Sequence, residues 1–123
     1  MTSDTSTLET WLSAYGRAWE KRDADAAAAL FTGDARYYET PYAEPFAGSV
    51  GVREYWARVT ADQRDVKVTH TIIGFADGVG VARWNSKFAL ASNGAHVELD
   101  GVYLLTFDAD GLCKELREWW HAR

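Results

Sequence analysis

The sequence predicts an α+β fold in which three N-terminal helices cover one face of a curved, mostly antiparallel sheet, shaped as a cone or half-barrel. Apolar residues recur every three to four positions in the first half of the chain, and from Val66 onward the period changes to two. Gly-containing turns separate the strand-like runs of the second half, which favours hairpins between consecutive strands. The 123 residues suffice for one core and are too few for two, so we expect one domain over residues 1–123.

A first helix is expected to begin at Ser6, because Ser6 and Glu9 have the spacing of a capping box. The apolar residues that follow at helical spacing are Leu8, Trp11, Leu12, Tyr15, Ala18 and Trp19. They place three aromatic side chains on consecutive turns of one helix face. This face is predicted to point into the core.

Two further helices are expected. Asp23 is positioned to cap a short helix over residues 24–31, which is rich in Ala and ends before Gly33. Ser49 is positioned to cap the third helix. The apolar residues at helical spacing in that helix are Val52, Trp56 and Val59.

Between the second and third helices, residues 35–40 are rich in aromatic and other strand-forming residues. They end before Pro41, which disfavours helix at the preceding position. We expect a strand here, followed by a proline-containing loop. Tyr37 and Glu39 share one face of this strand and are predicted to point inward.

Four strands are expected in the second half of the chain, over residues 66–75, 79–90, 96–107 and 112–121. Period-two alternation predicts an inner face that includes His70, Trp84, Tyr103, Glu118 and Trp120. The outward set is too apolar for solvent and includes Ile73, Phe75, Val102, Leu104 and Trp119, with Cys113 on the same side. We therefore expect a homodimer formed through the outer sheet face.

Composition and charge exclude several classes of partner. With 13 Lys and Arg against 18 Asp and Glu, the formal charge is −5 and no basic cluster is present, so we expect no binding to nucleic acid or anionic membranes. We also expect no membrane span and no export signal. The single Cys113 permits no internal disulfide, which fits a cytoplasmic location. The three histidines lie on separate segments, so no metal site is expected.

The aromatic content indicates a pocket. Six Trp, six Tyr and five Phe exceed what a core of this size needs. Each buried polar group without a partner costs about 1–3 kcal/mol, so a sealed core would use aliphatic side chains instead. We interpret the rings and carboxyl groups as the lining of a small-molecule pocket, with these candidate ligand-binding residues: Trp19, Tyr37, Trp56, Trp84, Glu118 and Trp120. For Trp19, Trp84 and Trp120, simple core packing is the alternative.

Two stretches resemble a known family. The first runs from Tyr15 to Trp56 and includes Asp23, Ala29-Leu30-Phe31, Asp34-Ala35, an acidic residue before a proline loop, Gly48 and Val52-Arg53-Glu54-Tyr55-Trp56. The second consists of Phe107 with Gly111 through Trp120. Together they resemble the nuclear transport factor 2-like superfamily, and within it the SnoaL-like and ketosteroid isomerase-like proteins. The resemblance implies a cone-shaped, mixed but mostly antiparallel sheet wrapped around three N-terminal helices.

By this resemblance, Tyr15 takes the position of the isomerase oxyanion tyrosine and Glu39 that of the general base. Tyr103 stands where those enzymes have a protonated aspartic acid, because Asp100 lies on the wrong strand face. The resemblance therefore implies that Tyr15 and Tyr103 hold an enolate oxygen while Glu39 removes a proton from carbon. His70 is either a second acid–base group or a core histidine with its hydrogen bonds satisfied.

Two functions remain open at this point. One is a cofactor-free isomerase, cyclase or lyase that acts by proton transfer on a small hydrophobic, ring-containing carbonyl compound. The other is a ligand-binding or dimerisation module without turnover. For Glu39, the alternative to catalysis is a carboxylate at the cavity rim, bonded to a backbone donor or to Arg36.

Overall fold

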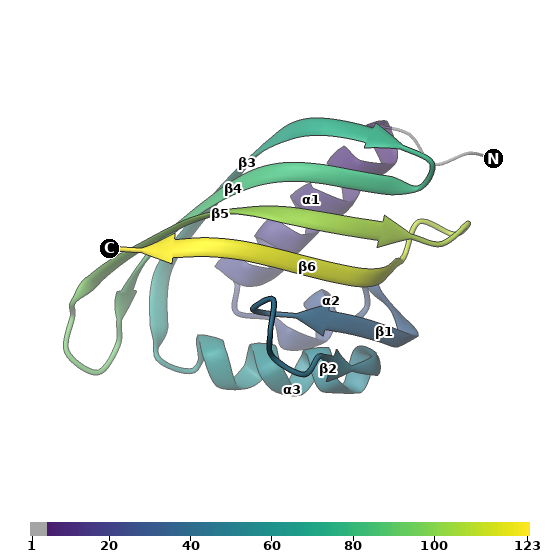
Figure 1. Ribbon diagram of the computed structural model, residues 1–123. Helices are drawn as coiled ribbons and strands as arrows, with labels where there is room; N and C mark the ends of the chain where they lie inside the picture. Colours follow the sequence, from purple (N-terminus) through teal and green to yellow (C-terminus); the bar gives the residue numbers. More distant parts are fainter. Residues whose placement is uncertain (1–4) are drawn as a thin grey trace.

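The computed structural model describes residues 5–123, which form three helices and six strands (Figure 1). In chain order these are α1 (Thr5–Glu20), α2 (Ala24–Ala28), β1 (Phe31–Tyr38), β2 (Phe46–Ala47), α3 (Gly48–Thr60), β3 (Gln63–Ala76), β4 (Val79–Leu90), β5 (His96–Phe107) and β6 (Cys113–Ala122). Helices dominate the first half of the chain and long strands the second, as predicted.

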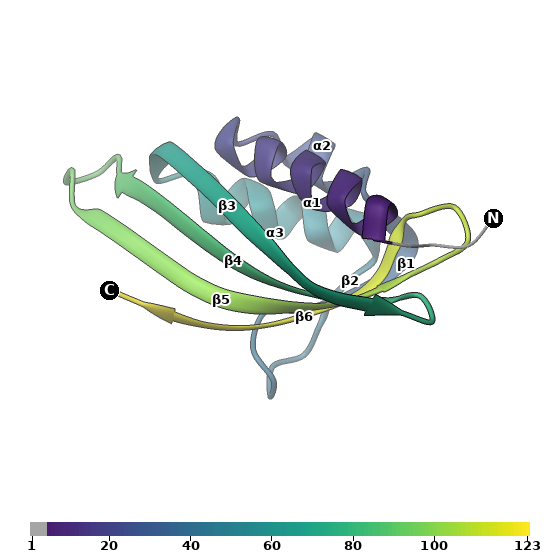
Figure 2. The ribbon, with the colours of Figure 1, turned by 90° about the horizontal axis from the view of Figure 1, so that it is seen from above.

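All six strands form one open sheet in the order β2-β1-β6-β5-β4-β3. Neighbouring strands are antiparallel except β1 and β6, which run parallel and are joined by a long crossover. The sheet is curved, and α1, α2 and α3 all lie against the same face of it (Figure 2). The predicted α+β class, with a curved, mixed and mostly antiparallel sheet, is therefore confirmed.

The strands of the second half agree closely with the predicted ranges. β4 and β5 have the predicted bounds, β6 begins one residue later, and β3 is longer at both ends. Between β3 and β4, Asp77 and Gly78 have φ values of 54° and 77°. Two successive positive φ angles are typical of the type I′ turn that joins tightly paired strands.

The second helix is shorter than predicted. α2 ends at Ala28 and β1 already begins at Phe31, so Gly33 lies within a strand rather than after a helix. Phe31 is buried and pairs with Cys113 of β6. Helix propensities of ordinary residues differ by about 0.7 kcal/mol or less, whereas burying a Phe side chain contributes about 1.5–3 kcal/mol. Packing therefore decides the end of this helix.

Of the predicted helix caps, the one at Asp23 is confirmed, because its carboxylate accepts a backbone hydrogen bond at 3.0 Å. The caps predicted at Ser6 and Ser49 are wrong, since α1 and α3 each begin before these residues. Burial of the inward faces orients both helices instead. α1 buries the whole predicted stripe, including Trp11 and Trp19.

Two register shifts overturn the predicted orientation of Phe75 and Cys113. The pairing of β3 with β4 shifts between Ile72 and Gly74, and Phe75 turns inward, where its ring lies 6.0 Å from that of Phe107. The pairing of β5 with β6 shifts next to Phe107, and Cys113 is fully buried in the core. A bulge inserts one extra residue, so alternation counted along the chain reverses beyond it.

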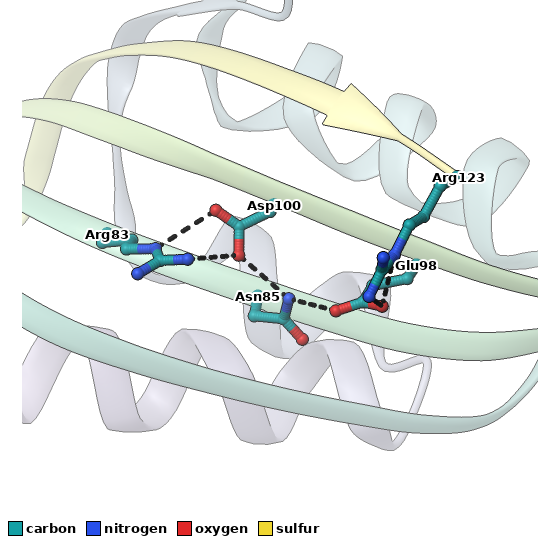
Figure 3. A network of polar contacts seen from close by, with 5 residues as sticks. All are labelled: Arg83, Asn85, Glu98, Asp100 and Arg123. Carbon is teal, nitrogen blue, oxygen red and sulfur yellow. Dashed lines mark hydrogen bonds and ion pairs between the residues drawn. The ribbon is translucent and has the colours of Figure 1, made fainter.

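The outer face of the sheet mixes exposed apolar side chains with a polar network. Ile73 and Trp119 are 63% and 45% exposed. The network drawn in Figure 3 connects Arg83, Asn85, Glu98, Asp100 and Arg123. Asp100 thus lies on the outer face, as predicted, and the homodimer through this face stays a prediction.

Candidate functional site

A cavity of about 150 Å³ lies between α3, the end of α1 and the inner side of the sheet. It is lined by Trp19, Tyr37, Glu39, Tyr55, Trp56, Val59, Gln63, Trp84, Leu99, Glu118 and Trp120. Six of these side chains are aromatic, two are carboxylic acids and none is a cation. Three hollows of larger volume each have only one Trp, Tyr or Phe in their lining. The predicted combination of rings and carboxyl groups therefore occurs at this cavity.

A chain of buried hydrogen bonds leads from α3 to Glu118. Trp56 Nε1 donates to the Tyr15 hydroxyl at 2.9 Å, and the Tyr15 hydroxyl donates to that of Tyr37 at 3.2 Å. Tyr37 in turn donates to Glu118 Oε1 at 3.1 Å. Burial raises the pKa of Tyr15 and of Tyr37 well above the ordinary value, so both hydroxyls keep their protons.

Glu118 lies at the end of this chain and is the more deeply buried of the two cavity acids. Burial raises the pKa of Glu118 to about 8, opposed by the hydrogen bond from Tyr37 and reinforced by the negative charge of Glu39. At neutral pH the Glu118 carboxyl group is therefore mostly protonated and able to donate a proton. Its side chain comes from β6, directly opposite Tyr103 of β5.

Glu39 lies just beyond the end of β1 and is half-buried. Its Oε2 accepts a hydrogen bond from the Tyr55 hydroxyl at 2.7 Å, and its backbone carbonyl accepts one from Trp120 Nε1 at 3.3 Å. Arg36 pairs with Glu115 at 2.9 Å instead. The alternative in which Arg36 holds the Glu39 carboxylate is therefore wrong.

The structure brings most of the predicted site residues together. Those that line the cavity are Trp19, Tyr37, Glu39, Trp56, Trp84, Glu118 and Trp120. Tyr15 and Tyr103 lie behind this lining: Tyr15 contacts Tyr37 through its hydroxyl, and Tyr103 stacks on Trp84 with ring centroids 5.1 Å apart. Neither of the two tyrosines predicted to hold a substrate oxygen is part of the cavity wall.

His70 is not brought to the cavity, and its predicted position among apolar neighbours is wrong. Its Nε2 lies 3.0 Å from both carboxylate oxygens of Glu9, and its side chain is 19% exposed. β3 is an edge strand of the sheet, and α1 runs along its inner side. An inward residue at this edge therefore meets the polar flank of α1 rather than the core.

Sequence reasoning missed Tyr55 and Gln63. Tyr55 follows Val52 by three residues and precedes Val59 by four, so the apolar stripe of α3 already contained the signal. Gln63 accepts a hydrogen bond from Trp19 Nε1 at 2.7 Å. Its position at the start of β3 carries no local pattern that points to the cavity.

No helix within residues 5–123 is long and apolar enough to cross a bilayer. The same range contains no group of three or more His, Cys, Asp or Glu side chains arranged to hold a metal ion.

Comparison with known proteins gives a family and a fold. A family model of the SnoaL-like domain matches residues 12–116, and no curated protein sequence matches. The fold is similar to that of SalBIII, an epoxide hydrolase/cyclase-like enzyme of pyran ring formation in the polyether salinomycin, with a TM-score of 0.82 and 19% identity over 96% of this chain and 93% of that one. It is also similar to a hypothetical protein with a ketosteroid isomerase-like fold from Catenulispora acidiphila, solved with trimethylamine, with a TM-score of 0.79 and 16% identity over 95% and 86%. The chain belongs to the SnoaL-like domain family.

Proposed function

We propose that this chain is a cofactor-free enzyme that acts by proton transfer on a small hydrophobic compound that contains or forms a ring. The reaction is an isomerisation, a cyclisation or a cleavage. In the proposal, Glu39 is the general base and Glu118 the general acid. One observation carries it: two carboxyl groups in unlike surroundings, each held by a tyrosine, line the same aromatic cavity. Paired acids whose surroundings differ in this way are typical of acid–base catalysis.

In the proposed reaction, the Glu39 carboxylate takes a proton from a carbon or hydroxyl group of the substrate. Protonated Glu118 gives its proton to the oxygen on which negative charge develops. A ketone becomes an enol in this way. A hydroxy epoxide closes a new ether ring as one C–O bond forms and one epoxide C–O bond breaks. Proton exchange with water then resets both carboxyl groups.

The tyrosines act on the carboxyl groups rather than on the substrate. Tyr37 orients Glu118, and Tyr55 orients Glu39. Tyr15 supports Tyr37 from the core, while Tyr103 supports the ring of Trp84. These are positioning roles, which replace the direct contacts that the family resemblance implied for Tyr15 and Tyr103.

The likeness to SalBIII supports a cyclase or hydrolase within this class. SalBIII is named as an epoxide hydrolase/cyclase-like enzyme. At 19% identity that likeness extends to the fold, so the chemistry rests on the acid–base pair of this chain.

The test uses Glu39→Gln and Glu118→Gln, with Glu54→Gln as a control on the exposed side of α3. The substrates are a panel of cyclic ketones, followed by deuterium exchange next to the carbonyl, and hydroxy epoxides, followed by ring closure. Each cavity variant is expected to lower kcat by about 100-fold or more, with ligand affinity changed only a few-fold. The control is expected to match the parent.

The pH profile separates the two acids. The proposal predicts an alkaline limb of kcat/KM near pH 8, caused by loss of the Glu118 proton. This limb should be absent from the residual activity of Glu118→Gln. Full activity of either Gln variant would show that the assigned acid or base is wrong.

The second candidate is a binding module without turnover. The aromatic lining of the cavity favours it, since such a lining can hold a small ligand without any reaction. A structural neighbour of similar fold was solved in complex with the small amine trimethylamine. If the parent converts no compound of the panel while binding several of them, this second function replaces the first.

The proposal extends to assembly and location. We propose that two copies pair through the outer sheet face in the cytoplasm. Ile73 and Trp119 supply exposed apolar contact area there. Arg83 and Asp100 already pair with each other on this face, so covering them leaves no isolated charge.

A further inference from the structure

Four tryptophans line the cavity, and three of their indole N–H groups have acceptors within the protein. Trp19 donates to the side chain of Gln63, Trp56 to the hydroxyl of Tyr15, and Trp120 to a backbone carbonyl. Trp84 differs. Its Nε1 is buried, and no acceptor for it is found among residues 5–123.

The Trp84 ring is held in place on several sides. It stacks on Tyr103 with an interplanar angle of 13°, and it packs against Trp19 with ring centroids 5.6 Å apart. It also lies close to Gly101 of β5, where an added Cβ would come 2.9 Å from Trp84 Cε2, the carbon bonded to Nε1. The ring therefore has no freedom to turn toward another acceptor.

A buried N–H group without an acceptor costs about 1–3 kcal/mol, so proteins rarely keep one without a reason. Trp84 is 2% exposed and is one of the residues that line the cavity. The acceptor that the N–H group lacks in the protein is therefore expected from a molecule within the cavity.

We propose that Trp84 Nε1–H donates a hydrogen bond to an oxygen of the bound molecule. This molecule is neutral, is about the size of a six-membered ring, and carries a carbonyl or ring-ether oxygen. The size follows from the cavity, since a volume of about 150 Å³ matches one that holds benzene in another protein. The aromatic walls favour an apolar ring, and the free donor requires a lone pair.

This inference rests on the cavity being the substrate site of the proposed function, and it names the substrate class. In a proton-transfer reaction, the same N–H group stabilises the negative charge that develops on that oxygen. An organic cation would also find aromatic faces and the Glu39 carboxylate here, but it would offer no lone pair to Trp84 unless it carried an oxygen as well. The two ligand classes are therefore separable by experiment.

The experiment compares two ligands of nearly the same shape, cyclohexanone and methylenecyclohexane, of which only the ketone has an oxygen. Binding is followed through the indole N–H resonances of the ¹⁵N-labelled protein. Cyclohexanone is expected to move the Trp84 Nε1–H resonance downfield, whereas methylenecyclohexane moves it little. The resonance is assigned through its contacts with Tyr103, so this arm needs no variant.

A second arm uses Trp84→Phe, with Trp120→Phe as the matched control. Both changes remove an indole from the cavity wall, but only the first removes a donor that has no acceptor in the protein. The ratio of ketone to alkene affinity is expected to fall about tenfold in Trp84→Phe, which corresponds to about 1.4 kcal/mol. It is expected to stay within twofold in Trp120→Phe.

The proposal is overturned if saturating ketone leaves the Trp84 resonance in place, or if the affinity ratio falls equally in both variants. Binding of tetramethylammonium without binding of the ketone also overturns it. Because these readouts measure binding, they are independent of turnover. A catalytic failure of Glu39 and Glu118 is therefore distinguishable from a failure at Trp84.

Discussion

Tyr37 of β1 donates a hydrogen bond to Glu118 of β6 at 3.1 Å, across a sequence separation of 81 residues. Both side chains are buried, and the two strands are the parallel pair of the sheet. The bond connects Glu118 to a chain of hydrogen bonds that runs from the indole N–H group of Trp56 through the hydroxyl groups of Tyr15 and Tyr37. It makes the properties of Glu118 sensitive to changes at Tyr37.

The first prediction concerns stability against pH. The pKa of Glu118 is about 8 in the folded chain and near the ordinary 4.5 when unfolded. Below pH 4.5 both states carry the proton, so Glu118 costs no stability there. Between pH 4.5 and 8 only the folded state keeps it, so its effect is to lower the free energy of unfolding by about 1.4 kcal/mol per pH unit.

Glu118→Gln removes this titration, so its stability relative to the parent should rise from pH 5 to pH 8 and level off above. Urea unfolding at pH 5, 6, 7, 8 and 9 measures the difference. Glu54→Gln, on the exposed face of α3, provides the reference. Parallel stability curves for parent and Glu118→Gln would mean that Glu118 ionises in the fold as it does in water.

The second prediction concerns Tyr37→Phe. The hydrogen bond from Tyr37 opposes the rise in the pKa of Glu118, so its loss should move that pKa above 8. The measurement is a pH titration of the Glu118 carboxyl carbon by NMR. Tyr38→Phe is the matched control, because the Tyr38 ring packs against Arg117, with the guanidinium carbon 3.9 Å from its centroid. A pKa that falls in Tyr37→Phe would contradict the proposed bond.

The third prediction concerns Gly101→Ala. A Cβ at this position would overlap the Trp119 carbonyl and lie 2.8 Å from Trp120 Cβ and 2.9 Å from Trp84 Cε2. Overpacking of this kind costs about 1–3 kcal/mol, or more where backbone must move. Gly74→Ala is the control, since its Cβ would meet nothing within 4 Å. Chemical unfolding should show a large loss for the first variant and none for the second.

The fourth prediction concerns self-association. If two copies pair through the outer face, Trp119→Asp should shift the protein toward monomer by at least tenfold in the dissociation constant. Sedimentation at several concentrations measures this. Val50→Asp removes a similarly exposed apolar side chain from α3 and should leave association unchanged. A parent that is monomeric at all concentrations would remove the dimer from the proposal.

The sheet was the most predictable part of the fold. β4 and β5 have the bounds expected from alternation and turn residues, because both signals are local. The bulges that turn Phe75 and Cys113 inward have no comparable local signal in the sequence. They depend on how one strand pairs with the next, which the residues of a single strand do not determine.

The candidate site was predictable in its members and not in their roles. Aromatic and acidic residues at inward positions pointed correctly to Trp84, Glu39 and Glu118 as cavity residues. Depth of burial was not predictable, because it arises only when α1 and α3 close over the sheet. For the same reason, Tyr15 was expected at the ligand and lies behind Tyr37 instead.

By itself, the sequence determined the α+β class, the order of all elements except the two-residue strand β2, and the combination of rings and carboxyl groups, since these follow from side-chain periodicity and composition. Only the tertiary structure decided that burial raises the pKa of Glu118, that His70 contacts Glu9 at the sheet edge, and that Trp84 Nε1 has no acceptor among residues 5–123. Desolvation and hydrogen-bond partners are set by residues distant in the chain, and the packed fold is what brings them together.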